Sequence, residues 1–289
     1  MLTFFVDSDC DVSLKEAKEF GCKMISMPYY VGDKEIKPYV DYEEFDSKAF
    51  YDMLREGNIP KTNALNQMDY QNYFEEEFAK GNDIFYVHFS AAMTSSFNSM
   101  HLCLEELKEK YPERKFYEVD TFGITLGAYP TTRGLMELYK KGETPENMVK
   151  WGEDMRFHYA TYFFADDLKF FAKSGRVSNF KSIMGGILNI KPILYMSADG
   201  MLTSISKGKG KKGTLLKILS YMDELGDDVA NYPIYIGHSD AIELAEEMSL
   251  MIKEKYGDNL DIRFVVVNPT AGSHCGPDSI GVSFHAKNR

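Results

Sequence analysis

The stretch that decides the fold is Asp83-Ile-Phe-Tyr-Val-His-Phe-Ser-Ala-Ala-Met-Thr-Ser-Ser-Phe-Asn-Ser99, an apolar run that passes directly into small and hydroxyl-bearing residues. The apolar run 83–89 predicts a buried strand. Residues 97–111 carry apolar side chains at helical spacing and predict a helix. A strand followed at once by a helix is the repeating unit of an α/β fold with a parallel sheet.

The junction between this strand and this helix is a candidate anion-binding site. The N–H groups at the start of a helix have no partner within the helix and attract carboxylates and phosphates. Thr94, Ser95 and Ser96 would supply further donors. The alternative is an ordinary helix cap, because Ser and Thr commonly cap helices.

Outward from this stretch, strands and helices alternate along the chain. We expect strands at 2–6, 23–31, 83–89, 115–119, 160–165, 190–196, 202–206, 234–237, 263–267 and 280–285. We expect helices opening at 13–16 and spanning 47–56, 68–80, 97–111, 125–140, a segment from 144, 168–173, 179–188, 213–225 and 239–256. This order predicts a parallel sheet with helices on both faces, in which ligands bind beyond the carboxyl ends of the strands.

The length of 289 residues suits two domains. The strands 190–196 and 202–206 flank the turn dipeptide Asp199-Gly200, so they predict a hairpin and a mixed second sheet. We place the domain boundary near residue 150. The sequence therefore predicts an N-terminal α/β domain at 1–150 and a C-terminal α/β domain at 151–289.

Composition excludes several classes of protein. The net charge of −11 argues against general nucleic-acid binding, which needs a basic surface. No 18-residue apolar run predicts a membrane span, and the N-terminus lacks the basic residues of a signal peptide. Four scattered cysteines indicate reduced thiols and a cytoplasmic protein. The six histidines lack metal-ligand spacing, and no phosphate-binding or dinucleotide-binding glycine motif is present.

The loop 268–281 is a second candidate site, because three glycines and two prolines impose a specific backbone path on it. Such a path would hold His274 and Ser273 at fixed positions between two apolar strands. The alternative is a glycine-rich turn with a surface histidine. Cys275 also suggests a thiol nucleophile, but neighbours in sequence point apart, which disfavours a pair with His274.

Two basic segments are the remaining candidate binding sites. In Lys173-Ser-Gly-Arg-Val-Ser178, the guanidinium of Arg176 suits a carboxylate or phosphate, or else pairs with acidic surface neighbours. Lys207-Gly-Lys-Gly-Lys-Lys212 predicts a mobile cationic loop that is either solvated or docks an acidic or phosphate-bearing partner.

The order of these motifs resembles the DegV family of bacterial fatty-acid-binding proteins, which includes the FakB subunits of fatty acid kinase. The resemblance covers essentially the whole chain. It rests on Val6-Asp-Ser-Asp9, Thr62, Ser90–Ser99, Val119-Asp-Thr121, Lys173–Ser178, Ile190-Lys-Pro-Ile-Leu194 and Gly272–Gly281.

The resemblance implies a three-layer α/β/α domain joined to a second α/β domain, with a long-chain fatty acid buried between them. A separate ATP-dependent kinase subunit would phosphorylate the bound carboxylate to an acyl phosphate for phospholipid synthesis. The chain would then be a carrier without catalysis, cofactor, metal or stable membrane anchor of its own. The carboxylate-site residues implied are Thr62, Thr94, Ser95, Ser96 and His274, with Arg176 nearby and Lys209 in the region that docks the kinase.

The motifs depart from the family pattern in three places. The connector reads Thr62-Asn-Ala-Leu-Asn66 instead of Thr-Ser-x-Pro-Ser, the junction reads Met93-Thr-Ser-Ser96 instead of Leu-Ser-Gly-Thr, and Lys209 stands where an arginine is usual. Two other functions stay open. One is a small-molecule hydrolase or transferase with His274 as base and Ser273 or Thr94 as partner, and the other is a carrier of a different anionic apolar ligand.

Overall fold

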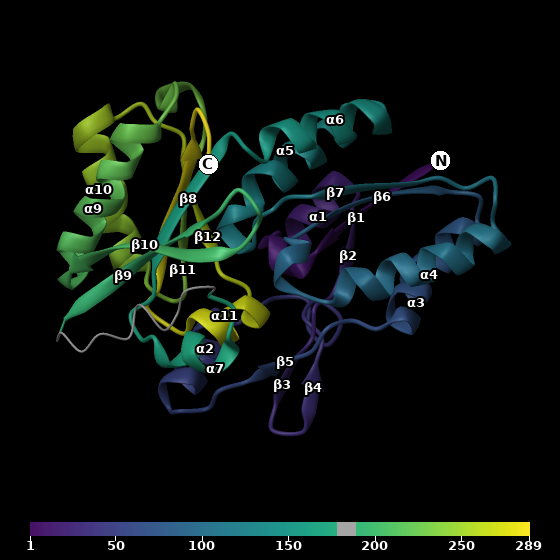
Figure 1. The fold of residues 1–289 in the computed structure, drawn as a ribbon, viewed down its shortest axis with the longest axis horizontal. Coiled ribbons are helices and arrows are strands. Elements are labelled where there is room, and N and C mark those ends of the chain that lie inside the picture. The colour runs from purple at the N-terminus through teal and green to yellow at the C-terminus, as the bar shows by residue number, and fades with distance from the viewer. Residues whose placement is uncertain (178–188) are drawn as a thin grey trace.

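The computed structural model describes residues 1–177 and 189–289, which form two main sheets side by side (Figure 1). The helix expected at 179–188, and Ser178, lie outside the described residues. Within these two described ranges, no helix has the length and hydrophobicity needed to cross a membrane.

The first sheet is parallel throughout, with strand order β2-β1-β6-β7. Its strands are β1 (Leu2–Asp7), β2 (Lys23–Ile25), β6 (Asp83–His88) and β7 (Phe116–Asp120). Its helices are α1 (Leu14–Phe20), α3 (Gln67–Ala79), α4 (Ser96–Lys110), α5 (Tyr129–Lys140) and α6 (Pro145–Met155). The helix start expected at 13–16 is confirmed, because a capping box between Ser13 and Glu16 opens α1.

Helices cover both faces of this sheet, because successive side chains of a buried strand point to opposite sides. Phe4 of β1 packs against Tyr139 of α5, whereas Phe5 packs against Phe74 of α3. The α4 helix packs beside α3, and α6 packs beside α5. The three-layer α/β/α arrangement is therefore confirmed.

The strand expected at 23–31 is wrong as a single element. It divides into β2 and β3 (Tyr29–Val31), and β3 forms a separate antiparallel sheet with β4 (Lys34–Ile36) and β5 (Lys61–Thr62). Pro28 has no N–H group to give to a sheet, and the N–H of Met27 donates to the Ser8 hydroxyl at 2.9 Å. The chain consequently leaves the first sheet at this point.

The second sheet is mixed, with strand order β10-β9-β8-β13-β11-β12. Its strands are β8 (Tyr159–Phe164), β9 (Ile190–Met196), β10 (Leu202–Lys209), β11 (Ile234–His238), β12 (Ile262–Val266) and β13 (Ile280–His285). Its helices are α7 (Lys169–Ser174), α9 (Gly210–Leu225), α10 (Ile242–Tyr256) and α11 (Pro269–Cys275). The antiparallel β9–β10 pair confirms the expected hairpin.

One face of the second sheet packs against α9 and α10 through a large apolar core. Tyr162 of β8 points into this core and stacks on Tyr221 of α9, with ring centroids 4.4 Å apart. The next residue, Phe163, points to the other face, which looks toward the first sheet. This second face is the one that takes part in the candidate site.

Three local expectations in this half are wrong. The cationic loop 207–212 is instead the end of β10 followed by the start of α9. The helix expected at 239–256 begins only at Ile242, as α10, and the Ser239 hydroxyl accepts the Ser279 N–H at 2.8 Å. The loop 268–281 contains the α11 helix, with Asn268 as its cap and Pro269 in its first turn.

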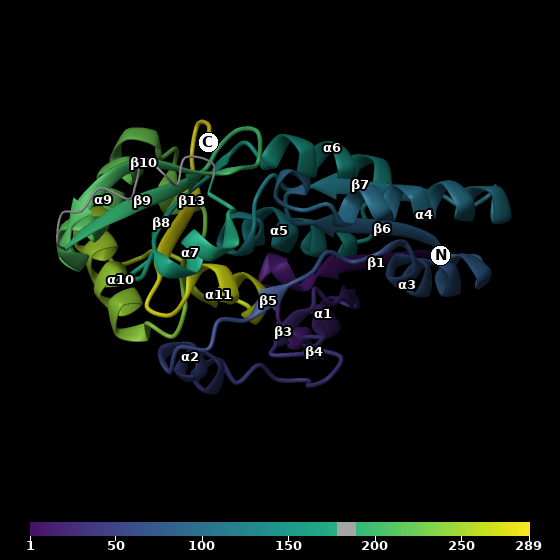
Figure 2. The same cartoon turned by 60° about the horizontal axis from the view of Figure 1, so that its bottom comes forward.

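Residues 32–60, named here the α2 excursion, extend from the β3–β4 hairpin across to the second half, which their helix contacts. Their helix α2 (Ser47–Arg55) sits beside α7 and α11 in both views (Figures 1 and 2). The Tyr51 hydroxyl donates to the carbonyl of Val267 at 2.8 Å, and Arg55 pairs with Asp240 and Asp278. The domain boundary near residue 150 stays a prediction; it falls within α6, which packs on the first half.

The contact between α2 and α11 depends on a glycine, which gives a first prediction. A Cβ added at Gly272 would lie 2.6 Å from the Tyr51 hydroxyl oxygen. We expect Gly272→Ala to lower the free energy of unfolding by about 1–3 kcal/mol in chemical denaturation. The control is Gly213→Ala in α9, where the added Cβ meets nothing within 4 Å, so stability stays or rises. Equal stability of the two variants would contradict the packing of Gly272 on Tyr51.

Candidate functional site

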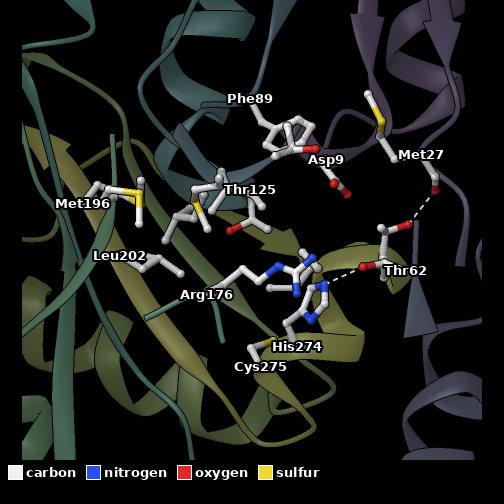
Figure 3. A pocket seen from close by; sticks show the side chains of 18 of the residues that line it. Asp9, Met27, Thr62, Phe89, Thr125, Arg176, Met196, Leu202, His274 and Cys275 are labelled. Atoms are coloured by element: carbon white, nitrogen blue, oxygen red, sulfur yellow. Dashed lines mark hydrogen bonds between the residues drawn. The ribbon is translucent and has the colours of Figure 1, made fainter. Parts of the chain in front are cut away.

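A cavity of about 610 Å³ lies between the carboxyl ends of the first sheet and the free face of the second (Figure 3). This volume falls in the range of small-molecule pockets, about 300–1,000 Å³. Its apolar lining includes Phe89, Ile124, Phe163, Phe171, Met196 and Leu202. Polar side chains from both halves line it as well, so the cavity has an apolar wall and a polar region.

Thr62 and His274 meet in this cavity, although 212 positions separate them in the sequence. The Thr62 hydroxyl lies 2.9 Å from Nε2 of His274, as Figure 3 shows. Thr62 is brought there by β5, which pairs with β3, and His274 by the last turn of α11. The sequence predicted both residues for the site, and the fold supplies the contact between them.

The junction before α4 also lines the cavity through Thr94, Ser95 and Ser96. The Ser96 N–H donates to the Thr94 hydroxyl at 3.1 Å, and the Thr94 hydroxyl donates to the Ser96 hydroxyl at 3.0 Å. The Ser96 hydroxyl also accepts the Leu65 N–H, which ties the Thr62 connector to this helix start. Ser95 precedes the helix without a side-chain cap bond and is exposed.

Arg176 lines the cavity and Lys209 is not among its lining residues. Arg176 follows α7, which ends at Gly175 with a left-handed backbone (φ 66°). Figure 3 shows its guanidinium beside the His274 ring. Burial, and secondly this cation, lower the pKa of His274 to about 4, so the imidazole is neutral at physiological pH. Lys209 ends β10 at the surface instead.

Three buried carboxyl groups lie at the end of β1 and directly after it, at Asp7, Asp9 and Asp11. Burial raises the pKa of Asp7 to about 6 and that of Asp11 to about 8. Asp11 Oδ1 accepts both the backbone N–H and the side-chain amide of Asn268, at 2.9 and 2.7 Å. Asp11 thereby holds the start of α11, the helix that carries His274.

Val6-Asp-Ser-Asp9 was one of the motifs on which the family resemblance rests, but Asp9 was not predicted as a site residue. Asp9 lines the cavity together with Met27 and Thr270, which were not singled out. The Thr270 hydroxyl donates to the carbonyl of Met27 at 2.7 Å. The signal for Thr270 was its spacing of four residues from His274, which places both on one face of a helix.

The state of His274 gives a second prediction. In a pH titration followed by NMR, we expect no protonation of its ring between about pH 7.5 and 5, where an ordinary histidine takes up its proton. Because the folded pKa is about 4 and the ordinary value 6.5, the unfolded chain binds more protons in that window, and this group destabilises the fold as pH falls through it.

The matched variant is Arg176→Gln, which removes the cation beside the ring. We expect it to raise the pKa of His274 only part of the way to 6.5, because burial is the larger cause of the shift. His274→Asn assigns the resonance. A midpoint near 6.5 in the unchanged protein would contradict the buried, neutral imidazole.

Comparisons with known proteins match almost the whole chain to one family. A family model described as "Uncharacterised protein, DegV family" matches residues 2–287. A DegV domain-containing protein of Clostridium perfringens is 31% identical over 280 residues, which cover 97% of this chain and 96% of that protein.

Two solved structures share the fold. One, described as fatty acid binding of a DegV family protein from Thermus thermophilus, has a TM-score of 0.85 at 20% identity and 99% coverage of both chains. The other is the Streptococcus pneumoniae fatty acid kinase B3 protein loaded with linoleic acid, with a TM-score of 0.81 at 18% identity, covering 99% of this chain and 100% of that one. The predicted α/β fold, with one parallel and one mixed sheet, is confirmed, and this chain belongs to the DegV family.

Proposed function

We propose that this protein binds a long-chain fatty acid in the cavity between its two sheets. The proposal rests on one observation: a polar region and an apolar wall line the same cavity. The carboxylate lies against the polar region, and the hydrocarbon chain runs along Phe163, Met196 and Leu202 on the second sheet. The proposed carboxylate-site residues are Thr62, Thr94, Ser95, Ser96 and His274, with Arg176 beside them.

Physical chemistry supports this assignment at both ends of the ligand. Each buried CH₂ of the chain contributes ~0.8 kcal/mol, so a long chain binds strongly by burial alone. The carboxylate needs donors in that setting, and charge-assisted hydrogen bonds contribute ~1.5–3 kcal/mol each. Arg176 supplies a cation, the start of α4 supplies backbone N–H groups, and Thr62 and Thr94 supply hydroxyls.

The hydrolase alternative receives less support from the geometry. The Ser273 hydroxyl is 2% exposed, donates to the carbonyl of Pro269 at 2.8 Å, and is not among the cavity-lining residues. Burial raises the pKa of the Cys275 thiol to about 12, which leaves it un-ionised and a poor nucleophile. His274 bonds Thr62, and neither Thr94 nor Ser273 bonds His274, because their hydroxyls donate to Ser96 and to the carbonyl of Pro269. The base and nucleophile pairs considered for a hydrolase are therefore not formed, and we favour a carrier.

Mass spectrometry tests the proposal through Thr94→Val, which removes the hydroxyl and keeps the shape. We expect a fatty acid bound one-to-one to the purified protein and released on denaturation. After delipidation and reloading at sub-saturating fatty acid, we expect occupancy reduced ~3- to 10-fold in Thr94→Val, from one lost hydrogen bond of about 1 kcal/mol. The control is Thr161→Val in the same cavity, whose hydroxyl bonds Ser283 on the second sheet.

Circular dichroism confirms that both variants fold. Equal occupancy in Thr94→Val and the unchanged protein would remove Thr94 from the carboxylate site. A protein that purifies empty and takes up no added fatty acid would overturn the carrier function itself.

We further propose that the bound carboxylate is presented to a separate ATP-dependent kinase, which forms the acyl phosphate. The similarity to a fatty acid kinase B3 protein supports this step. The carboxylate site includes exposed Ser95, and Lys209 is exposed on β10, the edge strand of the second sheet. An exposed lysine at this edge is available to an acidic partner surface.

The kinase step is tested with loaded protein, ATP and a purified fatty acid kinase catalytic subunit. We expect acyl phosphate only when the kinase is present, and a transfer rate at sub-saturating carrier that falls ~3- to 10-fold in Lys209→Glu, because a charge reversal at an interface mainly slows association. Lipid occupancy stays unchanged. Lys150→Glu, an equal charge reversal at an exposed site on α6, is the control. Equal losses in both variants would exclude Lys209 from the docking surface.

A further inference from the structure

His88 is a buried histidine that the proposed carboxylate site does not use. It is the last residue of β6, it has no exposed surface, and it lies directly before Phe89, which lines the cavity. Nδ1 of its ring lies 2.6 Å from the carbonyl oxygen of Phe89. Nε2 lies 2.9 Å from a carboxylate oxygen of Glu118 on β7. Both ring nitrogens therefore face an oxygen at hydrogen-bond distance.

The two oxygens determine which form of the ring fits between them. A backbone carbonyl and an ionised carboxylate can only accept hydrogen bonds, and a neutral imidazole has a single N–H to donate. Burial opposes ionisation of Glu118, but its hydrogen bonds with His88 and His101 outweigh this and lower its pKa. With Glu118 ionised, only the doubly protonated, positively charged ring donates to both oxygens.

The surroundings of the ring favour the same charged form. Burial opposes the charge, but the hydrogen bond to Glu118 and the nearby carboxylate of Asp120 outweigh it and raise the pKa of His88 above 6.5. Phe97 of α4 stacks on the ring, with the two centroids 3.9 Å apart. The face of an aromatic ring attracts a cation, so this contact is also stronger when His88 is charged.

Four other ionisable side chains face this charged pair from the elements around it. Burial raises the pKa of the Tyr70 and Tyr86 hydroxyls well above the ordinary value, so both stay neutral. Burial raises the pKa of Asp7 to about 6, so above this pH Asp7 is an anion that favours a cation beside it. His101 of α4 is 54% exposed and lies 2.9 Å from the second carboxylate oxygen of the pair.

His88 contacts the proposed carboxylate site at both ends of the junction before α4. Its ring bonds the carbonyl of Phe89, where the chain leaves β6, and stacks on Phe97 in the first turn of α4. Thr94 and Ser96 lie between these two contacts along the chain, and both line the cavity. Loss of the ring proton removes one of the two hydrogen bonds and weakens the stacking. It also removes a positive charge that favours an anion at the junction.

We propose that His88 is a positioning residue for the carboxylate site, which binds a fatty acid tightly while the His88 ring is charged and more weakly once the ring has lost its proton. The inference rests on the proposed fatty-acid binding and specifies the regulation of that site. Because the form that binds more tightly holds the proton, affinity falls as pH rises. The pKa of His88 lies above 6.5, so the fall occurs on the alkaline side of this value.

Binding of linoleic acid to the delipidated protein tests this dependence between about pH 6.5 and about pH 9.5. His274, with a pKa of about 4, stays neutral throughout this range. We expect the dissociation constant to rise about 10-fold across it. NMR of the His88 ring in the same buffers should give a titration midpoint that coincides with the midpoint of the change in affinity. A constant affinity would overturn the inference and leave fatty-acid binding intact.

Two variants assign the dependence to the His88 ring. Glu118→Gln keeps an oxygen that accepts from Nε2 but removes the negative charge, so we expect both midpoints to move about 1–3 pH units lower. The matched control is His101→Gln, whose exposed amide still donates to Glu118. We expect this control to keep the midpoints of the wild type.

The remaining outcomes separate the inference from the function on which it rests. An unchanged affinity midpoint in Glu118→Gln would assign the dependence to another group, such as Asp11 with its pKa of about 8, and overturn the inference. Loss of the dependence in His101→Gln would overturn it as well. Thermal unfolding shows whether each variant is folded, and the two wild-type midpoints test the inference without them. Failure to bind linoleic acid at any pH in the range would overturn the proposed function instead.

Discussion

The pair of hydrogen bonds from Asn268 to Asp11 is the interaction on which the site depends. It joins the loop after the first strand of one sheet to the start of a helix in the other half, and both partners are buried. Asn268 also caps α11. The orientation of α11 therefore follows from the first half, and α11 in turn carries His274, Thr270 and Gly272. Loss of this pairing would displace one wall of the cavity as a unit.

The sequence predicted most of the architecture because local signals agreed with the global fold. The apolar run before Ser90, the capping box at Ser13 and the Asp199-Gly200 turn each correspond to the expected element. Expectations were wrong where tertiary contacts decide. The pairing of β3 with β5 joins Tyr29 to Thr62, which lie far apart in sequence, and no local pattern marks that contact. Residues 207–209 are ordered because the β9–β10 hairpin continues beyond residue 206, the expected end of its second strand.

In the candidate site, too, local sequence signals predicted some residues and tertiary contacts decided the others. Residue types indicated Thr94, Arg176 and His274 as candidate polar site residues, the family resemblance added Thr62, and the fold places all four in one cavity. The burial of Asp9 was not predictable, because an aspartate after a strand is ordinarily solvated. Only the covering by the second half shows that its Oδ1 is buried and without a partner among the described residues. Desolvation disfavours the charged form of both titratable groups, since it lowers the pKa of His274 and raises the pKa of Asp9.

The α2 excursion affects how a ligand can enter and leave the cavity. The chain passes from the first half to the second at α2, returns at β5, and passes again before β8, while Arg289 at the far end of the chain reaches back to the carbonyl of Phe122. Three covalent passages, together with the pairing of Arg55 with Asp240 and Asp278, tie the two halves to each other at more than one point. Under the proposed function, an acyl chain buried between the halves would leave by displacement of one wall of the cavity, and not by a rotation of the halves about one hinge.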